Sequence, residues 1–241
     1  MTWRRASVLE VRPENPAAHS LVLDIAGWPG HRPGQHLDVR LTAEGGYQAS
    51  RSYSIATPAA GSHVTLTVVR VPNGEVSPYL VDEARPGDQF EVRGPIGGYF
   101  VWEAGQGGPL LLVAGGSGAV PLMCMLRGRA EAGSQVPTTL LYSLRDEEAG
   151  LYLAELRAMA ANDPAFTLTL TYTRTAPAGW RGRTGRVDAQ MIADAAPSGR
   201  PELLSYVCGP TPFVEAVAGE LVALGFAPLK VKTERFGPTG G

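Results

Sequence analysis

The alternation of hydrophobic and polar residues changes character close to residue 104. Before it, short segments alternate apolar and polar positions and are separated by Gly/Pro turns, a pattern typical of half-buried β-strands. Strands are expected at residues 4–11, 18–25, 36–41, 50–54, 63–69 and 89–92. Strands this short and this evenly spaced favour an antiparallel barrel or sandwich. Residues 78–82 form the only convincing helical turn in this part.

After the Gly-rich stretch 104–109, fully apolar strands alternate with amphipathic helices. The strands are expected at 110–114, 138–142, 167–172 and 203–208, and the helices at 121–129, 151–160, 187–193 and 212–224. Continuous apolar strands that alternate with helices predict a parallel sheet covered on both faces, which binds ligands at the carboxyl ends of its strands. The sequence therefore predicts two domains, residues 1–104 and 105–241.

One expected strand carries a cation, an aromatic ring and small hydroxyls in the order Arg51-Ser52-Tyr53-Ser54. Strand alternation sends Arg51 and Tyr53 to one face. Arg51 can then form a forked pair with a pyrophosphate while Tyr53 covers a planar ring, as a flavin requires. Taken alone, the motif is more typical of cross-strand pairs in an ordinary sheet, so its interpretation depends on the rest of the chain.

Two further segments favour phosphate binding. In the first part, a strand ends at Val69 and Arg70, and the helical turn is preceded by a Gly-x-x-Ser segment, which offers a cation and a helix N-terminus. Its candidate residues are Gly74, Val76 and Ser77. In the second part, a glycine turn joins the first apolar strand to a helix, so that backbone N–H groups can approach a diphosphate. Its candidate residues are Gly115, Gly116, Ser117 and Gly118. Two phosphate sites imply two nucleotides.

The glycine turn departs from the usual dinucleotide fingerprint, because Pro121 takes the place of its third glycine. Proline suits a first helical turn, so the helix is still expected to start there. A glycine-rich connection that binds nothing is the alternative.

Polar residues follow the other parallel strands. Ser143 and Arg145 come directly after one strand, and Arg145, Arg174 and Arg183 are candidates to gather around a 2'-phosphate, which would favour NADPH over NADH. Ordinary surface arginines are the alternative. The last apolar strand ends in Cys208-Gly209-Pro210, which places a thiol at the expected ligand edge. A buried structural cysteine is the alternative there, and it is the expected role of Cys124.

Composition excludes several classes of protein. Lys plus Arg number 21 against 23 Asp plus Glu, so a net charge of -2 gives no electrostatic argument for a nucleic-acid or anionic-membrane partner. No signal peptide and no apolar stretch of roughly 18 residues is apparent, so a cytoplasmic location without membrane insertion is expected. Two cysteines cannot hold an iron–sulfur cluster. The four histidines show no metal pattern, and His31 and His36 are expected to be solvated surface residues. No metal is assigned.

With these motifs in order, the chain resembles the ferredoxin-NADP reductase superfamily over nearly its whole length. The resemblance implies a six-stranded antiparallel barrel that holds FAD and a parallel-sheet domain that holds NAD(P)H. It also implies roles for individual residues: Arg51 and Ser77 on the flavin pyrophosphate, Tyr53 on the isoalloxazine ring, Ser54 by its N5, Cys208 by the nicotinamide, Glu234 as a polar or proton-relay group, and Phe236 over the other flavin face.

The chain also departs from the family in places. Five residues, Gly237–Gly241, follow Phe236, whereas in many relatives the aromatic residue is at or near the terminus. Some relatives carry a fused ferredoxin-like domain, which this sequence lacks, and some bind FMN instead of FAD.

The expected function is a reductase that takes a hydride from NADPH or NADH onto FAD and passes electrons to a separate carrier. A small iron–sulfur protein is a plausible acceptor, and a haem or oxygenase partner fits equally. One alternative is an NAD(P)H-dependent reductase of free flavin or another small acceptor. A non-enzymatic alternative is an NAD(P)H-sensing subunit of a larger complex.

Overall fold

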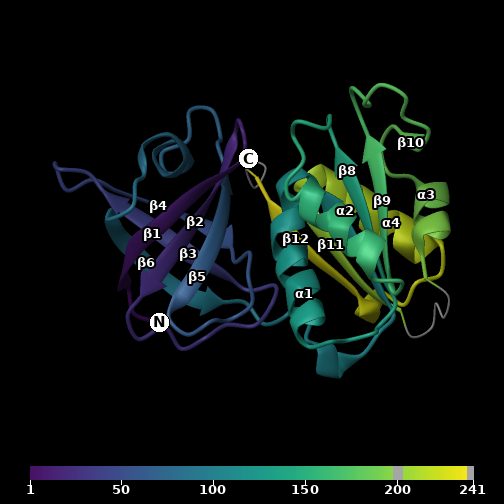
Figure 1. Cartoon of the computed structure of the whole chain (residues 1–241), viewed down its shortest axis with the longest axis horizontal. Helices are drawn as coiled ribbons and strands as arrows, with labels where there is room; N and C mark the ends of the chain where they lie inside the picture. Colours follow the sequence, from purple (N-terminus) through teal and green to yellow (C-terminus); the bar gives the residue numbers. More distant parts are fainter. Residues whose placement is uncertain (198–202, 238–241) are drawn as a thin grey trace. The chain divides into compact units, whose positions relative to one another are not determined.

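The computed structural model describes residues 1–197 and 203–237. The chain forms two compact units (Figure 1). The first consists of Met1–Glu103 with Met123–Gly128, and the second of Ala104–Leu122 with the described residues from Arg129 onward. Among the described residues, no helix is both long and apolar enough to cross a membrane.

The first unit contains a six-stranded antiparallel sheet. Its strands are β1 (Arg4–Asn15), β2 (Ala18–Ile25), β3 (His36–Thr42), β4 (Gln48–Ser54), β5 (His63–Val69) and β6 (Gln89–Ile96). They are ordered β4-β3-β6-β1-β2-β5, and a bridge between Ile55 and Leu66 joins the two edges of the sheet. A single wide helical turn, η1 (Tyr79–Glu83), lies between β5 and β6. This arrangement confirms the expected antiparallel six-stranded domain.

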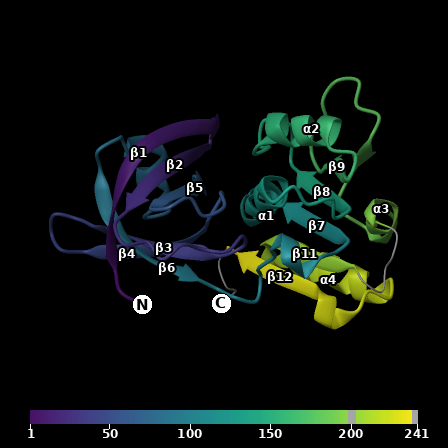
Figure 2. The same cartoon turned by 60° about the horizontal axis from the view of Figure 1, so that its bottom comes forward.

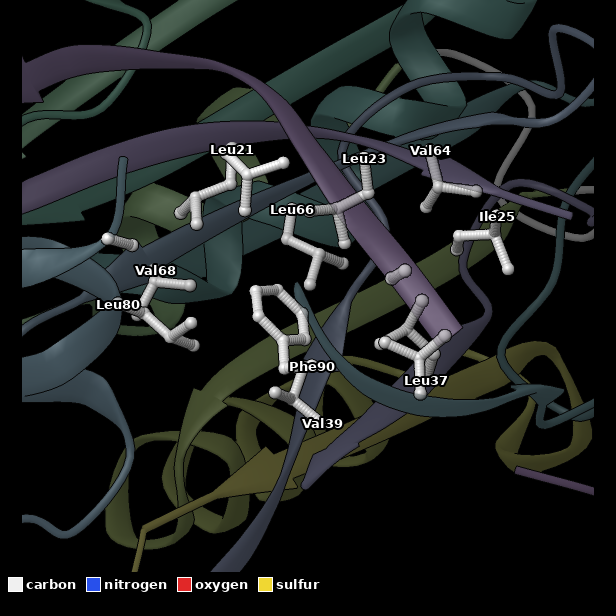
Figure 3. Close-up of a cluster of buried hydrophobic side chains, with 14 of the residues drawn as sticks. Leu21, Leu23, Ile25, Leu37, Val39, Val64, Leu66, Val68, Leu80 and Phe90 are labelled. Carbon is white, nitrogen blue, oxygen red and sulfur yellow. The ribbon is translucent and has the colours of Figure 1, made fainter. Parts of the chain in front are cut away.

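Alternation along these strands builds the core of the first unit. Figure 3 shows aliphatic side chains from β2, β3 and β5 gathered around Phe90 of β6, with Leu80 of η1 beside them. Leu21, Leu37 and Leu66 have no exposed surface. Each fully buried aliphatic side chain contributes about 1.5–3 kcal/mol, so this interior holds the strands that carry the candidate flavin residues.

The second unit is the expected parallel sheet with helices. Its strands are β7 (Leu110–Gly115), β8 (Thr138–Leu144), β9 (Phe166–Tyr172), β10 (Arg183–Thr184), β11 (Leu204–Pro210) and β12 (Val231–Phe236), and its helices are α1 (Ala119–Glu131), α2 (Leu153–Asn162), α3 (Ala189–Ala195) and α4 (Thr211–Ala223). Short helical turns lie at η2 (Ala104–Gln106), η3 (Gly116–Gly118) and η5 (Pro228–Lys230). The strands are ordered β10-β9-β8-β7-β11-β12. Figure 2 shows α1 and α2 over one face of this sheet and α3 and α4 over the other.

Two strands of the second unit are absent from the sequence expectation. β10 has only two residues, which is too short for any periodicity. β12 mixes polar and apolar residues, KTER between Val231 and Phe236, because it is an edge strand that pairs only with β11. Fully apolar strands such as β7 were found because neighbours and helices bury both of their faces.

Candidate functional site

The Arg51-to-Ser54 motif lies on β4, the edge strand beside β3. Arg51 pairs in register with Val39, and Tyr53 with Leu37, so both lie on the face of β4 that continues the core-facing residues of β3. Ser52 lies on the opposite face and donates a hydrogen bond to the Asp38 carboxylate at 2.7 Å. Ser54 ends the strand, where it pairs in register with His36. The structure therefore separates the motif into the two faces that the sequence predicts.

Tyr53 is the aromatic residue of this motif. It packs against the barrel core, and burial raises the pKa of its phenol. Its ring is therefore held in place by the interior of the first unit, and its hydroxyl stays protonated at neutral pH.

The guanidinium of Arg51 is held by neighbouring oxygen atoms. Its Nη2 lies 2.7 Å from Oε2 of Glu75, and its Nη1 donates to the Ser50 carbonyl oxygen at 2.7 Å. Tyr47, in the turn between β3 and β4, donates its hydroxyl to the other carboxylate oxygen of Glu75. These contacts bring Arg51 beside the Gly74-to-Ser77 segment, which is expected to bind the same diphosphate as Arg51.

The Gly74-to-Ser77 segment, called the Gly74-to-Ser77 turn below, follows a tight turn at Pro72 and Asn73 and bends the chain into η1. Ser77 is buried, and its hydroxyl oxygen accepts the backbone N–H of Val71 at 3.0 Å. A Cβ on Gly74 would stand 3.1 Å from both the Ser77 hydroxyl and the Val71 carbonyl oxygen, so a side chain there would crowd the turn. Val76 is fully buried and anchors the turn against the core.

Arg70 follows β5 and lies before this turn. Its Nε lies 2.6 Å from Oδ2 of Asp82 in η1, while Val69 pairs in register with Ala18 of β2. A guanidinium that already binds a carboxylate oxygen has the geometry to bind a phosphate oxygen. Together with Arg51, this residue fits the negatively charged diphosphate of a flavin nucleotide.

The glycine turn at the carboxyl end of β7 leads through η3 into α1. Gly116 has φ +54°, and a Cβ there would meet no atom within 4 Å, so its backbone faces open space in a conformation that favours glycine. A Cβ on Gly118 would lie 2.0 Å from the carbonyl oxygen of Cys208. Ser117 completes this turn, and Pro121 lies in the first turn of α1 as expected. Accessible backbone next to a helix start fits a diphosphate.

An aromatic residue that the sequence analysis missed lies at this edge. The ring belongs to Phe213 in the first turn of α4. A Cβ built on Gly115 would lie 2.8 Å from this ring, and a Cβ built on Gly209 would lie 2.7 Å from it. With Phe213 in place, packing within the domain leaves no room for a side chain at either glycine. The signal was the aromatic residue that follows the second glycine turn, Gly209-Pro210-Thr211-Pro212-Phe213.

Cys208 and Glu234 are brought together by strand pairing. They are register partners on β11 and β12, as are Pro210 and Phe236. Burial, and then the charge of Glu234, raises the pKa of the Cys208 thiol, so this residue is a neutral thiol. Phe236 has 36% of its surface exposed. Gly237 is the last described residue of the expected tail, and 238–241 lie outside the described residues.

The candidates for the nucleotide phosphate follow β8 and β9. Ser143 is buried and pairs in register with Gly115, so it lies beside the glycine turn. The Arg174 backbone N–H donates to the Arg145 carbonyl oxygen at 2.9 Å, which places these two residues side by side. Arg183 lies on β10, where its side chain forms an ion pair with Asp194 of α3.

The buried cysteine and histidine residues give one confirmation and one correction. Cys124 is fully buried, as expected. The expectation that His31 is a solvated surface residue is wrong, because only 9% of its surface is exposed. Its Nδ1 accepts the indole N–H of Trp28 at 3.0 Å, and its Nε2 lies 2.7 Å from the Thr57 carbonyl oxygen. The Pro/Gly-rich sequence around His31 concealed this partnership with Trp28.

Comparison with known families gives two matches. Residues 24–101 match the family of oxidoreductase FAD-binding domains, and residues 112–219 match the family of oxidoreductase NAD-binding domains. The candidate residues on β4, β5 and the Gly74-to-Ser77 turn fall in the first match, and the glycine turn and Cys208 fall in the second.

Relatives cover nearly the whole chain. The electron transfer component of 2-halobenzoate 1,2-dioxygenase from Burkholderia cepacia is 32% identical over 92% of this chain and 63% of its own length. A flavohemoprotein from Deinococcus radiodurans is 28% identical over 94% of this chain and 57% of its own length. The chain thus spans about three fifths of the length of these curated relatives.

Solved structures show the same architecture. The FAD/NAD-binding domain of a nitric oxide dioxygenase from Vibrio cholerae superposes with a TM-score of 0.86 at 25% identity, covering 98% of this chain and 99% of that one. A cytochrome P450 reductase from Amycolatopsis has a TM-score of 0.85 at 26% identity, covering 99% and 71%.

An FAD-binding domain followed by an NAD-binding domain, with candidate anion-binding arginines in the first and a glycine turn in the second, defines a class of flavin-dependent oxidoreductases. The chain belongs to the ferredoxin-NADP reductase superfamily, as its motifs indicate. FAD and a nicotinamide nucleotide are the cofactors of its two domain families, which confirms the cofactors expected from the sequence.

Proposed function

We propose that this protein takes a hydride from NADPH or NADH onto FAD and passes electrons to a separate carrier protein. The observation that carries the proposal is the tandem of an FAD-binding and an NAD-binding domain, with Arg51 beside a tight turn in the first and the paired Cys208 and Glu234 in the second. FAD, when bound, supplies the hydride acceptor and the release of single electrons.

The flavin residues of this proposal lie in the barrel, which we assign to residues 1–104. Arg51 and Arg70 hold the diphosphate through their guanidinium groups, and the Gly74-to-Ser77 turn supports it with backbone atoms. Val69 fixes the end of the strand that precedes this turn, and Val76 anchors the turn itself. Tyr53 covers the isoalloxazine ring, and its packing against the barrel core keeps it in one orientation. Ser54 supplies a small polar group beside the reactive ring nitrogen.

The nicotinamide nucleotide residues lie in residues 105–241. Gly115, Gly116, Ser117 and Gly118 present their backbone to the diphosphate, with Ser143 beside them. Arg145 and Arg174 read the 2'-phosphate of NADPH. Gly209 and Pro210 shape the edge where the nicotinamide enters.

Cys208 has a positioning role, because its neutral thiol is small and carries no charge that would repel or attract a hydride. Glu234, its register partner, provides a polar group and a proton relay at the same edge. Phe236, two residues further along β12 and partly exposed, covers a flavin face. These roles orient the reacting groups and exclude water, while the redox chemistry belongs to the cofactors.

The names of the relatives support a separate electron acceptor. Several are electron transfer or reductase components of oxygenase systems, which favours an iron–sulfur protein or an oxygenase as the acceptor. Flavohemoproteins among the relatives favour a haem as the second candidate.

The test is anaerobic stopped-flow reduction of the purified protein. We expect oxidised-flavin absorbance that bleaches on mixing with NADPH or NADH, and a slower bleach in Cys208→Ala that still contains flavin. Cys124→Ala, which removes the other buried thiol, is the matched control and should reduce at the wild-type rate. A protein that binds nucleotide without any flavin reduction would contradict the proposal and favour a sensor. An unchanged rate in Cys208→Ala would contradict the role of that residue alone.

A further inference from the structure

The contact that stands out in the barrel is the one that Arg51 makes with its own chain. Glu75 occupies one side of the guanidinium, with Nη2 and Oε2 2.7 Å apart. It is held there by a second residue, since Tyr47 donates a hydrogen bond to the remaining carboxylate oxygen. Both oxygens of the Glu75 carboxylate are therefore used, and Glu75 itself belongs to the turn that is assigned, with Arg51, to the flavin diphosphate.

The charge of Glu75 is stabilised by these contacts. The hydrogen bond from Tyr47, and then that from Arg51, lowers the pKa of the Glu75 carboxyl. The carboxylate is thus ionised throughout the neutral pH range. An ionised carboxylate on a guanidinium uses the same donors that a phosphate oxygen would use.

We propose that Glu75 competes with the FAD diphosphate for Arg51 and so is a residue that sets the affinity of the barrel for FAD. The inference rests on the proposed function, because it requires Arg51 to bind the diphosphate. When FAD binds, Arg51 exchanges the carboxylate for a phosphate oxygen, and the displaced Glu75 remains as a negative charge beside the phosphates. Both effects weaken FAD binding.

The exposure of the pair limits the size of the effect. The side chains of Arg51 and Glu75 are 53% and 43% exposed. An exposed ion pair of this kind contributes at most a modest free energy, so neutralising Glu75 is expected to tighten FAD binding by about two- to fivefold.

The test is the dissociation constant of FAD, measured by serial dilution of the FAD-loaded protein and the fluorescence of the FAD released. Glu75→Gln keeps the size of the side chain and removes its charge. Glu10→Gln is the matched control, because Glu10 forms a similarly exposed ion pair with Arg12 on β1. We expect tighter FAD binding in Glu75→Gln and the wild-type constant in Glu10→Gln. If the dissociation constant of FAD in Glu75→Gln is equal to or higher than that of the wild type, the proposal is overturned.

A double-mutant cycle separates this proposal from the assignment of Arg51. Arg51→Ala is expected to weaken FAD binding by about 10- to 100-fold, since it removes charge-assisted hydrogen bonds to the diphosphate. Glu75→Gln should then have a smaller effect in the Arg51→Ala background, because the competition for the guanidinium is gone and only the repulsion between Glu75 and the phosphates remains. If Arg51→Ala weakens binding while Glu75→Gln changes nothing in either background, the competition is wrong and the Arg51 assignment stands. If Arg51→Ala leaves the dissociation constant of FAD unchanged, both the competition by Glu75 and the assignment of Arg51 to the diphosphate are wrong.

Discussion

The two candidate nucleotide sites are built from different parts of the chain. In the barrel, the candidate site consists of side chains. Arg51 and Tyr53 lie on the edge strand β4, and Arg70 follows the other edge strand, β5. In the parallel-sheet domain, the candidate site consists largely of backbone: Gly116 faces open space, and Gly118 packs against the Cys208 carbonyl, where a side chain does not fit. The first site is therefore sensitive to the loss of a side chain, and the second to the gain of one.

The candidate arginines of the two domains differ in whether their side chains already form ion pairs. Arg51 and Arg70 each bind a carboxylate of the barrel. In the described part of the parallel-sheet domain, neither Arg145 nor Arg174 forms an ion pair through its side chain. By the proposal above, a diphosphate in the barrel competes with an internal carboxylate, whereas a phosphate at Arg145 or Arg174 would meet guanidinium groups that no described carboxylate occupies. The competition proposed for Glu75 therefore acts in the barrel and has no described counterpart at Arg145 and Arg174.

The largest expected effect is the gain of a side chain at Gly118. A methyl group there would lie 2.0 Å from a backbone carbonyl oxygen, so Gly118→Ala must move β11 or η3, which leads into α1. We expect the free energy of unfolding to fall by about 3 kcal/mol and nicotinamide nucleotide binding to be lost. Urea unfolding followed by circular dichroism, with an NADPH titration, measures both.

Gly219→Ala is the control for that substitution. Gly219 lies within α4, and a methyl group there would meet no atom within 4 Å. Since alanine favours a helix more than glycine does, this variant should be more stable by roughly 0.5–1 kcal/mol. Equal stability of the two variants would contradict the packing argument for Gly118.

A smaller effect is expected at the sheet-edge arginines. Arg145→Asp replaces a cation with an anion that repels a 2'-phosphate, so the ratio of kcat/KM for NADPH to that for NADH should fall by about tenfold or more. Arg12→Asp makes the same charge change on the barrel strand β1 and should leave the ratio unaltered. A ratio that does not respond to Arg145→Asp would show that this residue does not read the phosphate.

The smallest effect is the pH dependence of stability that a histidine of the barrel contributes. All four histidines precede residue 64, so the parallel-sheet domain has none to titrate. Burial lowers the pKa of His31, and the Nδ1 that accepts the Trp28 N–H must be unprotonated. The unfolded chain therefore binds this proton at higher pH than the folded chain. The stability that His31 contributes is present above its unfolded pKa of about 6.5 and is lost as the pH falls below it.

Urea unfolding at about pH 7.5 and 5.5 measures this effect. His31→Gln keeps an acceptor and a donor without a titrating ring, so it should lose less stability on acidification than the wild type, by under about 1 kcal/mol. His63→Gln, at an exposed position of β5, is the control for replacing a histidine with glutamine. Parallel pH curves for wild type and His31→Gln would contradict the role of His31.

The fold was predictable wherever burial imposes a pattern. Strands β2 and β5 were predicted with their observed bounds, because each alternates toward one core. Strand β12 was missed, since an edge strand with one partner can carry charged residues without cost. Glu234, which lies on that strand, therefore became a candidate only through family resemblance.

Contacts between side chains were the other feature that could not be predicted from the sequence. Nothing in the spacing of Tyr47, Arg51 and Glu75 reveals that their side chains converge, because the contact depends on a turn between β5 and η1. The same holds for Phe213, whose ring position follows from the start of α4. Motif order points to candidate residues for each nucleotide site, and only the structure shows which of them already have a partner.

The ring of Phe213 has a consequence for anyone who redesigns the nicotinamide edge. It lies within contact of the positions that a side chain on Gly115 or Gly209 would occupy, so these three residues share a single volume. A library that varies one of them while fixing the others will sample almost only overlaps. The total side-chain volume is conserved when the ring is replaced by a smaller side chain and one glycine is replaced by a larger residue. Substitutions at these three positions are therefore expected to be correlated.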